Sequence, residues 1–155
     1  MFTLLSCRSF KVTSSKPRTV SGAGIGGEVE FPVLGHYQSM TCTLHWKGIE
    51  KDAFALSAFK SHALELRGSQ QEYASGTSEI VTVPVRVVLR AVPKNLNLGS
   101  FQAGAQTEAE SEFEVTYMKV YVNGKEVCEI DKFNFIAKFG GVDYLASVRK
   151  DLGMS

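Results

Sequence analysis

The run EIVTVPVRVVLRAV at residues 79–92 most constrains what this chain can fold into. Its apolar side chains recur at every second position, and a period of two is that of a β-strand with one buried face. The other face carries Thr82, Pro84, Arg86 and Arg90. Because proline has no N–H to donate to a sheet, Pro84 predicts an edge position or a bulge. A domain built around such a strand is rich in β-structure.

A second strand signal is the stretch FEVTYMKVYVNGKEVCEIDKFNFI, residues 113–136. The dipeptide Asn123-Gly124 predicts a two-residue type I′ turn, in which both residues need a positive φ. Such a turn predicts three facing pairs: Val120 with Val127, Met118 with Glu129, and Tyr117 with Ile130. Neither face of this hairpin is cleanly polar, so we expect both faces to be covered, by a core and by a neighbouring subunit.

Other segments complete the predicted fold. Residues 40–47 alternate as a half-buried strand, and residues 64–73 look extended. Residues 50–63 predict a helix with Asp52 as its N-cap, and the residues on its apolar side are Phe54, Ala55, Ala58, Phe59 and His62. Residues 142–152 predict a short helix that ends before Gly153. The expectation is a mainly β (α+β) fold, an antiparallel two-sheet sandwich or barrel with one middle helix and a short C-terminal helix.

Residues 93–111 predict a long polar loop, of a length that is more often functional than not. The loop leads into carboxylates at every second position: Glu108, Glu110, Glu112 and Glu114. In an extended chain these side chains point the same way, about 7 Å apart, and they need water or basic groups to screen their repulsion. Two interpretations stay open. One is a solvated loop, and the other is a strand edge facing basic groups of an adjacent subunit, such as Arg86 or Arg90.

The segment SGAGIGGEVEFP, residues 21–32, contains the spacing G-x-G-x-x-G. A loop that cradles a dinucleotide needs a strand before it and a helix after it. The residues EVEFP that follow read as an extended segment instead. A nucleotide-binding enzyme is therefore a weak alternative. We interpret the glycines as a flexible arm or a close-packed loop at a subunit contact, and they are Gly22, Gly24, Gly26 and Gly27.

No catalytic or metal-binding motif stands out. The three cysteines lack a C-x-x-C spacing, and the three histidines lack ligand spacing. The chain has no nucleophile elbow, P-loop or H-E-x-x-H motif. No apolar run approaches the roughly 20 residues that a membrane helix requires. These observations predict a protein that is not an enzyme, with no cofactor, no metal and no membrane segment.

The first 27 residues hold four basic residues and no acid, although the net charge of the whole chain is only +1. The run MFTLLSCRSFKVTSSKPR has the composition of a mitochondrial targeting peptide, which leaves an imported β-rich binding module as an alternative. We favour a surface arm at residues 1–20, followed by one domain at residues 21–155.

The C-terminal run YMKVYVNGKEVCEIDKFNFIAKFGGVDYLASVRKDLGM resembles the ending of the major tail tube proteins of contractile-tailed bacteriophages. The residues that carry the resemblance are Tyr117, Tyr121, Gly124, Glu129, Ile130, Asp131, Gly141, Val142, Asp143, Leu152 and Gly153. The runs TLHW, LRGSQQ and VRVVLRAVPK resemble one branch of the family in the same order. The resemblance covers about residues 20–155, and residues 1–20 depart from the longer lead-in that is usual in the family.

The resemblance implies a structural protein that forms hexameric rings. The rings would stack into a tube with a continuous β-barrel as its inner wall, inside a contractile sheath, and DNA would pass through the lumen without specific binding. The implied partners are further copies of the chain and the tail sheath, baseplate and tape-measure proteins. The implied location is the virion tail, and the host cytoplasm during assembly. An alternative is the inner tube of a phage-tail-like bacteriocin or injection particle. On the inner wall of a tube, the glutamate row would repel passing phosphates.

Overall fold

The computed structural model describes residues 6–11, 15–20, 24, 26–73, 79–100 and 107–154. The elements in chain order are β1 (Ser6–Lys11), β2 (Ser15–Val20), β3 (Val29–Tyr37), β4 (Thr41–Trp46), α1 (Lys51–Leu56), β5 (His62–Tyr73), β6 (Ile80–Asn97), β7 (Ala109–Val122), β8 (Lys125–Asp131), β9 (Ile136–Phe139), β10 (Val142–Asp143) and α2 (Ala146–Asp151). The strand pairs of the described residues are antiparallel. The predicted mainly β, antiparallel fold is confirmed.

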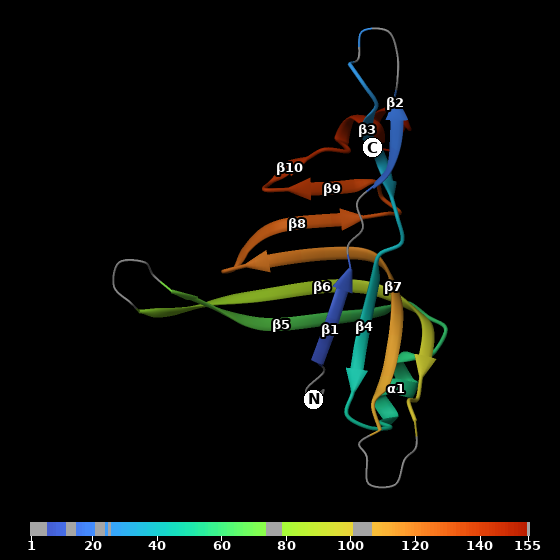
Figure 1. Cartoon of the computed structure of the whole chain (residues 1–155), viewed down its shortest axis with the longest axis vertical. Helices are drawn as coiled ribbons and strands as arrows, with labels where there is room; N and C mark the ends of the chain where they lie inside the picture. The colour runs from blue at the N-terminus through green and yellow to red at the C-terminus, as the bar shows by residue number, and fades with distance from the viewer. Residues whose placement is uncertain are drawn as a thin grey trace.

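The two longest strands, β6 and β7, organise the main sheet. β6 pairs with β7 along one edge of β7. On the other edge, β4 pairs with the first half of β7 and β8 with the second half. The order β1-β4-β7-β8-β9-β10 completes the sheet, with β5 on the outer side of β6, while β2 and β3 form a separate pair. Figure 1 shows β7 curving from the direction of β4 into the direction of β8.

Two bulges accompany this curvature. The register between β6 and β7 shifts between Arg90 and Ala91 and again between Pro93 and Asn95. The extra residue on β7 is Thr116, whose hydroxyl donates to the Arg90 carbonyl at 3.2 Å and whose carbonyl accepts from the Lys132 N–H at 3.1 Å. Because a bulge bends and twists its strand, the two halves of the β6–β7 hairpin face each other across a core.

The core fills the inside of this bend. Its buried side chains are Met40, Cys42, Leu44, Trp46, Ala53, Leu64, Leu89, Ala91, Ala109, Phe113, Val115, Met118 and Ile130. The alternation predicted for residues 40–47 is confirmed, because Cys42, Leu44 and Trp46 are buried on one side. The Trp46 indole N–H donates to the buried Ser111 hydroxyl at 3.0 Å, so the core satisfies its one indole donor.

The hairpin turn between β7 and β8 is of the predicted type. Asn123 has φ 50° and Gly124 has φ 75°, as a type I′ turn requires. The predicted facing pairs were wrong, because Val127 is an extra residue that shifts the register. The observed pairs are Val120 with Cys128, Met118 with Ile130, and Tyr117 with Asp131. The bulge places Ile130 in the core beside Met118 and turns Glu129 to the opposite face.

The helices are shorter than predicted. The helix expected over residues 50–63 ends at Leu56, with Glu50 rather than Asp52 at the N-cap and no side-chain cap. The Ser57 hydroxyl donates to the Ala53 carbonyl at 2.8 Å, a local bond that competes with helix continuation. The C-terminal helix begins at Ala146, because Val142 and Asp143 form β10. Its predicted end is confirmed, with Gly153 at φ 69° just after it.

The segment expected as an N-terminal arm contributes strands. β1 pairs with β4 from Ser6↔His45 to Lys11↔Thr41, and β2 pairs with β3. The backbone of residues 6–11 therefore extends the main sheet beyond β4. Figure 1 shows β1 beside β4, and β2 and β3 reaching toward the end of the molecule where β9 and β10 lie.

Candidate assembly surfaces

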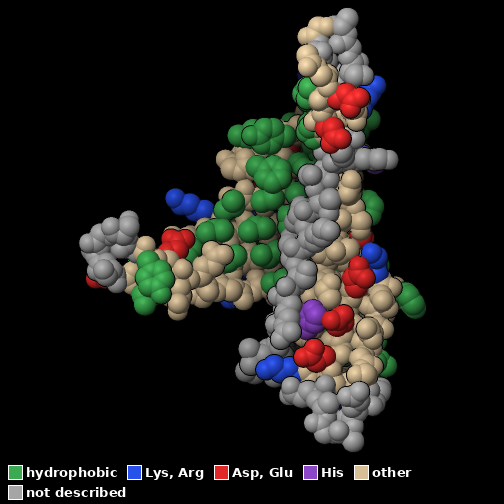
Figure 2. All heavy atoms as spheres, in the orientation of Figure 1, with side chains coloured by type: hydrophobic (Ala, Val, Ile, Leu, Met, Phe, Trp, Pro, Cys, Tyr) green, Lys and Arg blue, Asp and Glu red, His purple; other side chains and the backbone are tan. Residues whose placement is uncertain are grey.

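One face of the sheet formed by β5 to β9 is apolar and accessible. We call it the open face. It consists of the half-buried side chains Leu66, Val83, Val85, Val87, Val120, Val122 and Cys128 and the exposed side chains Val81 and Phe139. In Figure 2 hydrophobic side chains gather over β6, β7, β8 and β9, to the left of β1. The open face continues the core outward, and apolar side chains gathered on one accessible face are typical of an interaction surface.

The hairpin of β5 and β6 extends beyond the rest of the sheet. We call this extension the arm. β7 ends opposite Val85, and the Asn123 N–H just after it donates to the Pro84 carbonyl at 2.9 Å. Beyond that point the described part of the arm pairs with itself, residues 69–73 with residues 80–84. Pro84 lies here, one residue beyond the last β6–β7 pair, which confirms its predicted edge position. The apolar side chains of the arm are largely exposed: Tyr73 by 74%, Ile80 by 58% and Val81 by 48%. An isolated two-stranded ribbon is marginally stable in water, which indicates that the arm contacts a partner.

The opposite face of the same strands is polar. We call it the charged face. The Arg86 guanidinium lies over the Tyr121 ring at 4.2 Å from its centroid, and the Arg90 guanidinium lies 5.4 Å from that of Tyr117. Both arginines come from β6 and both tyrosines from β7. Among the described residues, neither arginine forms an ion pair with the glutamate row: in the register of the sheet Arg90 lies opposite Tyr117, past the bulge.

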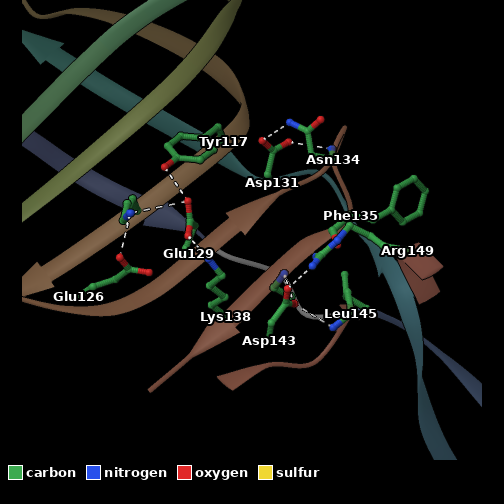
Figure 3. Close-up of polar contacts among 12 residues, drawn as sticks. Tyr117, Glu126, Glu129, Asp131, Asn134, Phe135, Lys138, Asp143, Leu145 and Arg149 are labelled. Atoms are coloured by element: carbon green, nitrogen blue, oxygen red, sulfur yellow. Dashed lines mark hydrogen bonds and ion pairs between the residues drawn. The ribbon is translucent and has the colours of Figure 1, made fainter. Parts of the chain in front are cut away.

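Lys119 and Glu129 are the centre of an ion-pair network on the charged face (Figure 3). The Lys119 ammonium lies 2.8 Å from the Glu126 carboxylate and 3.7 Å from that of Glu129. Glu129 also accepts from the Tyr117 hydroxyl at 3.0 Å and lies 3.3 Å from the Lys138 ammonium. Every member of this network is therefore compensated by a neighbour on β7, β8 or β9.

This network shifts the protonation of its members. The hydrogen bond with Glu126 and the nearby Glu129 charge raise the pKa of Lys119. Burial would raise the pKa of Glu129, but the hydrogen bonds from Tyr117 and Lys138 and the two lysine charges outweigh it, so the pKa lies below its usual range. Sequence reasoning missed this network, because its partners face each other only through the bulge at Val127. The alternation Tyr117, Lys119, Tyr121 was the signal in the sequence.

The glutamate row lies on β7, on its outward side. The polar loop predicted over residues 93–111 was wrong at both ends, because β6 continues to Asn97 and β7 begins at Ala109. Glu110 lies 3.2 Å from the His45 ring, Glu112 lies 3.3 Å from the Lys94 ammonium, and Glu114 lies 3.0 Å from that of Lys132. Glu108 is exposed just before β7.

Glu114 is the most constrained residue of the row. Burial would raise its pKa, but hydrogen bonds from Ser39 and Lys132 lower it below the usual range. The row thus belongs to a strand rather than to a solvated loop, and three of its members have a basic partner inside the chain.

The glycine segment precedes a strand. β3 begins at Val29, which confirms the predicted extended segment. A dinucleotide cradle needs a helix at this position, and the structure has a strand there instead. Gly24 has φ +103°, in the left-handed region that glycine tolerates. A Cβ added at Gly24, Gly26 or Gly27 would meet nothing within 4 Å. Gly22 lies outside the described residues.

Two aspartates fix the C-terminal part of the fold (Figure 3). Asp131 accepts from the N–H groups of Phe133 and Asn134, both at 3.0 Å. Asp143 accepts from the Leu145 N–H at 3.1 Å and pairs with Arg149 at 2.6 Å. These two residues belong to the resemblance seen in the sequence, and their observed role is to hold the turn after β8 and the turn before α2.

The described residues hold no group of three or more His, Cys, Asp or Glu side chains placed to bind a metal ion. Neither helix in the described part of the chain has the length and apolar character of a membrane span. An apolar groove with a volume of about 380 Å³ lies between β3, β9 and the turn before α2.

Comparison with known proteins places these features in a family. Residues 11–153 match the family described as phage tail tube protein FII. The chain is 32% identical over 139 residues to the tail tube protein of Escherichia phage P2, which covers 86% of this chain and 77% of the relative. A family match over nearly the whole chain, on a β-rich fold with an open apolar face, identifies a structural component of the virion tail: the chain belongs to the phage tail tube proteins.

Proposed function

We propose that this tail tube protein assembles into hexameric rings that stack into the inner tube of a contractile phage tail, the conduit for DNA ejection. The observation that carries the proposal is the open face. Burial of apolar surface contributes roughly 25 cal/mol per Å², and apolar patches above a few hundred Å² are rare on monomers. A neighbouring copy that covers the open face removes it from water.

The edges of the sheet support closure into a ring. In the half of the sheet that runs β5-β6-β7-β8-β9-β10, the described residues place β5 at one edge and β10 at the other. β5 is long, and among the described strands it pairs with β6 alone; an edge of this kind favours pairing with another chain. Contact between one edge and the opposite edge of the next copy is head-to-tail, and such contacts generate rings when the rotation closes.

The charged face suits the inner wall of a DNA conduit. Arg86 and Arg90 lie over tyrosine rings, and Lys119 and Lys138 pair with carboxylates. Free cations along a wall would displace the counterions of DNA and hold its phosphates. Lysines that are already paired with carboxylates bind DNA weakly, so they let DNA slide past without specific binding. The tyrosine rings contact the two arginines but leave their charge in place.

The remaining parts of the proposal concern the tail as a whole. The partners are further copies of this chain, together with the tail sheath, baseplate and tape-measure proteins, and assembly takes place in the host cytoplasm. The family membership supports them, since a tail tube is enclosed and terminated by other tail proteins.

Electron microscopy of the purified protein over a concentration series tests the proposal, with native mass spectrometry for ring size. We expect hexamers and hollow tubes. A sharper form compares two neighbours on β6 that point to opposite faces: Val83→Glu charges the open face, while Thr82→Glu charges the other face. The first should stop ring formation and the second should not, with circular dichroism unchanged in both. Monomers of the unaltered chain at every concentration would contradict the proposal.

We further infer a role for the glutamate row, Glu108, Glu110, Glu112 and Glu114, at the lumen or at a subunit contact. The support is its outward position on β7 and the three basic partners that hold it. Salt screens charges only beyond roughly 8–10 Å, so neighbouring carboxylates in the row still repel one another. The basic partner of each paired glutamate reduces this repulsion.

Replacing Glu110, Glu112 and Glu114 by Lys distinguishes a lumen wall from a subunit contact. Gln at the same three sites is the charge-neutral control. On a lumen wall, tubes form but retain DNA with a steep salt dependence. At a subunit contact, tubes fail to form. Normal tubes with normal DNA ejection would leave the row without either role.

A further inference from the structure

Apolar side chains around α1 remain outside the core. The sequence predicted Phe54 and Phe59 on the buried side of a long helix, but within α1 the core takes in Ala53. Ile49 is 46% exposed, Phe54 is 48% exposed and Phe59 is 98% exposed. We call these three residues the α1 cluster. A single exposed apolar side chain is ordinary, and three within residues 49–59 make this segment a candidate contact surface.

The turn that carries Phe59 is held in place by hydrogen bonds. The Ser57 N–H donates to the Ala53 carbonyl at 3.1 Å, and the Lys60 N–H donates to the Ala58 carbonyl at 2.7 Å. The His62 ring lies 3.0 Å from the same Ala58 carbonyl. Phe59 is therefore presented to water from a fixed backbone, which lowers the entropy lost when a partner binds it.

The apolar groove lies toward the other end of the molecule. Its walls are Pro32, Val33, Leu34, Phe139, Tyr144 and Leu145, and the described residues that line it include no charged side chain. Leu34 is 65% exposed and Tyr144 is 57% exposed. In Figure 1, α1 lies at one end of the long axis, whereas β3, β9 and β10 lie toward the opposite end.

The groove is already shaped in the single chain. The Asp143 carboxylate fixes the wall at Leu145 by accepting its N–H at 3.1 Å, and the paired Arg149 donates to the Phe135 carbonyl at 2.9 Å. At the floor, a Cβ on Gly35 would come within 3.5 Å of the Phe135 ring. A preformed apolar groove binds an aromatic side chain without a cost for reorganisation.

We propose that Phe59 of one copy packs into the groove of a second copy in the next ring, so that the α1 cluster and the groove form the contact between stacked rings. The inference rests on the proposed function. The two surfaces differ and lie toward opposite ends of one chain, so each copy offers both halves of the contact. Head-to-tail contacts that repeat along the tube axis do not close into a ring, so they generate an open-ended stack. Phe139 belongs both to the groove and to the open face, so the two contacts adjoin there. The rest of the open face and the β5 edge remain available to close each ring.

The test substitutes Phe59→Ser and, separately, Leu34→Ser, with Phe133→Ser as the matched control, because Phe133 is 73% exposed and lies outside both surfaces. Tubes are measured by electron microscopy and rings by native mass spectrometry. We expect the first two variants to keep hexameric rings and to raise the critical concentration for tube growth by at least about tenfold, the equivalent of about 1.4 kcal/mol. The control should grow tubes as the unaltered chain does.

A cross-linking experiment tests the pairing itself. The double variant Phe59→Cys with Leu34→Cys is treated with a short bis-maleimide, and each single variant serves as a control. Covalent multimers larger than a hexamer, in the double variant alone, support the contact. Their absence from assembled tubes overturns it.

Two further outcomes are distinguishable. If the unaltered chain forms no rings, the proposed function fails. If Phe59→Ser grows tubes of normal length, this inference fails while the proposed function stands. Failure of that variant only when sheath protein is added would mean that Phe59 docks a different protein, and it would also overturn the inference.

Discussion

The two halves of the β6–β7 hairpin carry similar alternating sequences but reach different states. In the half beside β4, the inward residues of β7 from Ala109 to Val115 are buried. In the half beside β5 and β8, the inward residues Val85, Val87, Val120 and Val122 remain half-exposed. The difference is the cover: the first half, with β4 beside it in the sheet, faces the core, whereas the open face of the second half extends past the core. The apolar alternation of a strand predicts which of its faces is buried. Whether that face is buried within one chain depends on the elements that pack against it.

The largest expected effect comes from the covered half. Phe113 is fully buried at the centre of the core, so Phe113→Ala leaves a cavity and should lower the free energy of unfolding by about 3–5 kcal/mol. Urea denaturation of the protein below its assembly concentration measures this. A loss under about 1 kcal/mol would mean that this half is not the core.

The turn that joins β7 to β8 should have the next largest effect. Gly124→Val places a β-branched residue at φ 75°, which costs on the order of 1–2 kcal/mol or more. We expect a lower melting temperature and weaker assembly, because the hairpin carries part of the open face. Gly26→Val is the control, because a Cβ meets nothing within 4 Å at either glycine but only Gly124 has a positive φ. Equal melting of both variants contradicts the type I′ turn.

The charged face predicts a pH dependence. The pKa of Glu129 is lowered in the folded chain, so its contribution to stability is present above the unfolded value of about 4.3 and is lost as the pH falls through the lower folded pKa. Glu129→Gln should cost about 1 kcal/mol at pH 7, and this difference should shrink in acid. Denaturation at a series of pH values checks it, and a difference that stays constant down to acid pH would remove Glu129 from the network.

The smallest effect on folding should come from the open face. Val81→Thr changes a side chain that is 48% exposed, so the free energy of unfolding of the monomer should move by less than about 0.5 kcal/mol. Assembly should nevertheless weaken, because the same side chain is apolar contact surface. Light scattering and denaturation of the same sample compare the two quantities. A large loss of monomer stability with normal assembly would reverse the roles of the two halves.

Much of the local structure could be predicted from the sequence. The alternation of residues 79–92 and 40–47, the Asn123-Gly124 turn and Gly153 after the last helix all match the structure, because each depends on a few neighbouring residues. The family resemblance also came from the sequence, and the match over residues 11–153 confirms it. The candidate site was predicted in part: the spacing of the glutamates at every second position left a strand open as one of two interpretations, but it did not indicate their partners.

The sequence by itself therefore determined the strands, the turn type and the family, because periodicity and turn chemistry act over short distances. The tertiary structure decided the register of the β7–β8 hairpin, the residue at which α1 ends and which apolar faces are buried. The extra residue Val127 changes which side chains face each other, and this depends on pairing across the whole hairpin. Phe59 was expected inside and lies outside, because Ser57 ends the helix and β5 begins at His62. The burial of an apolar face depends on elements distant in sequence, and for the open face it depends on another copy of the chain.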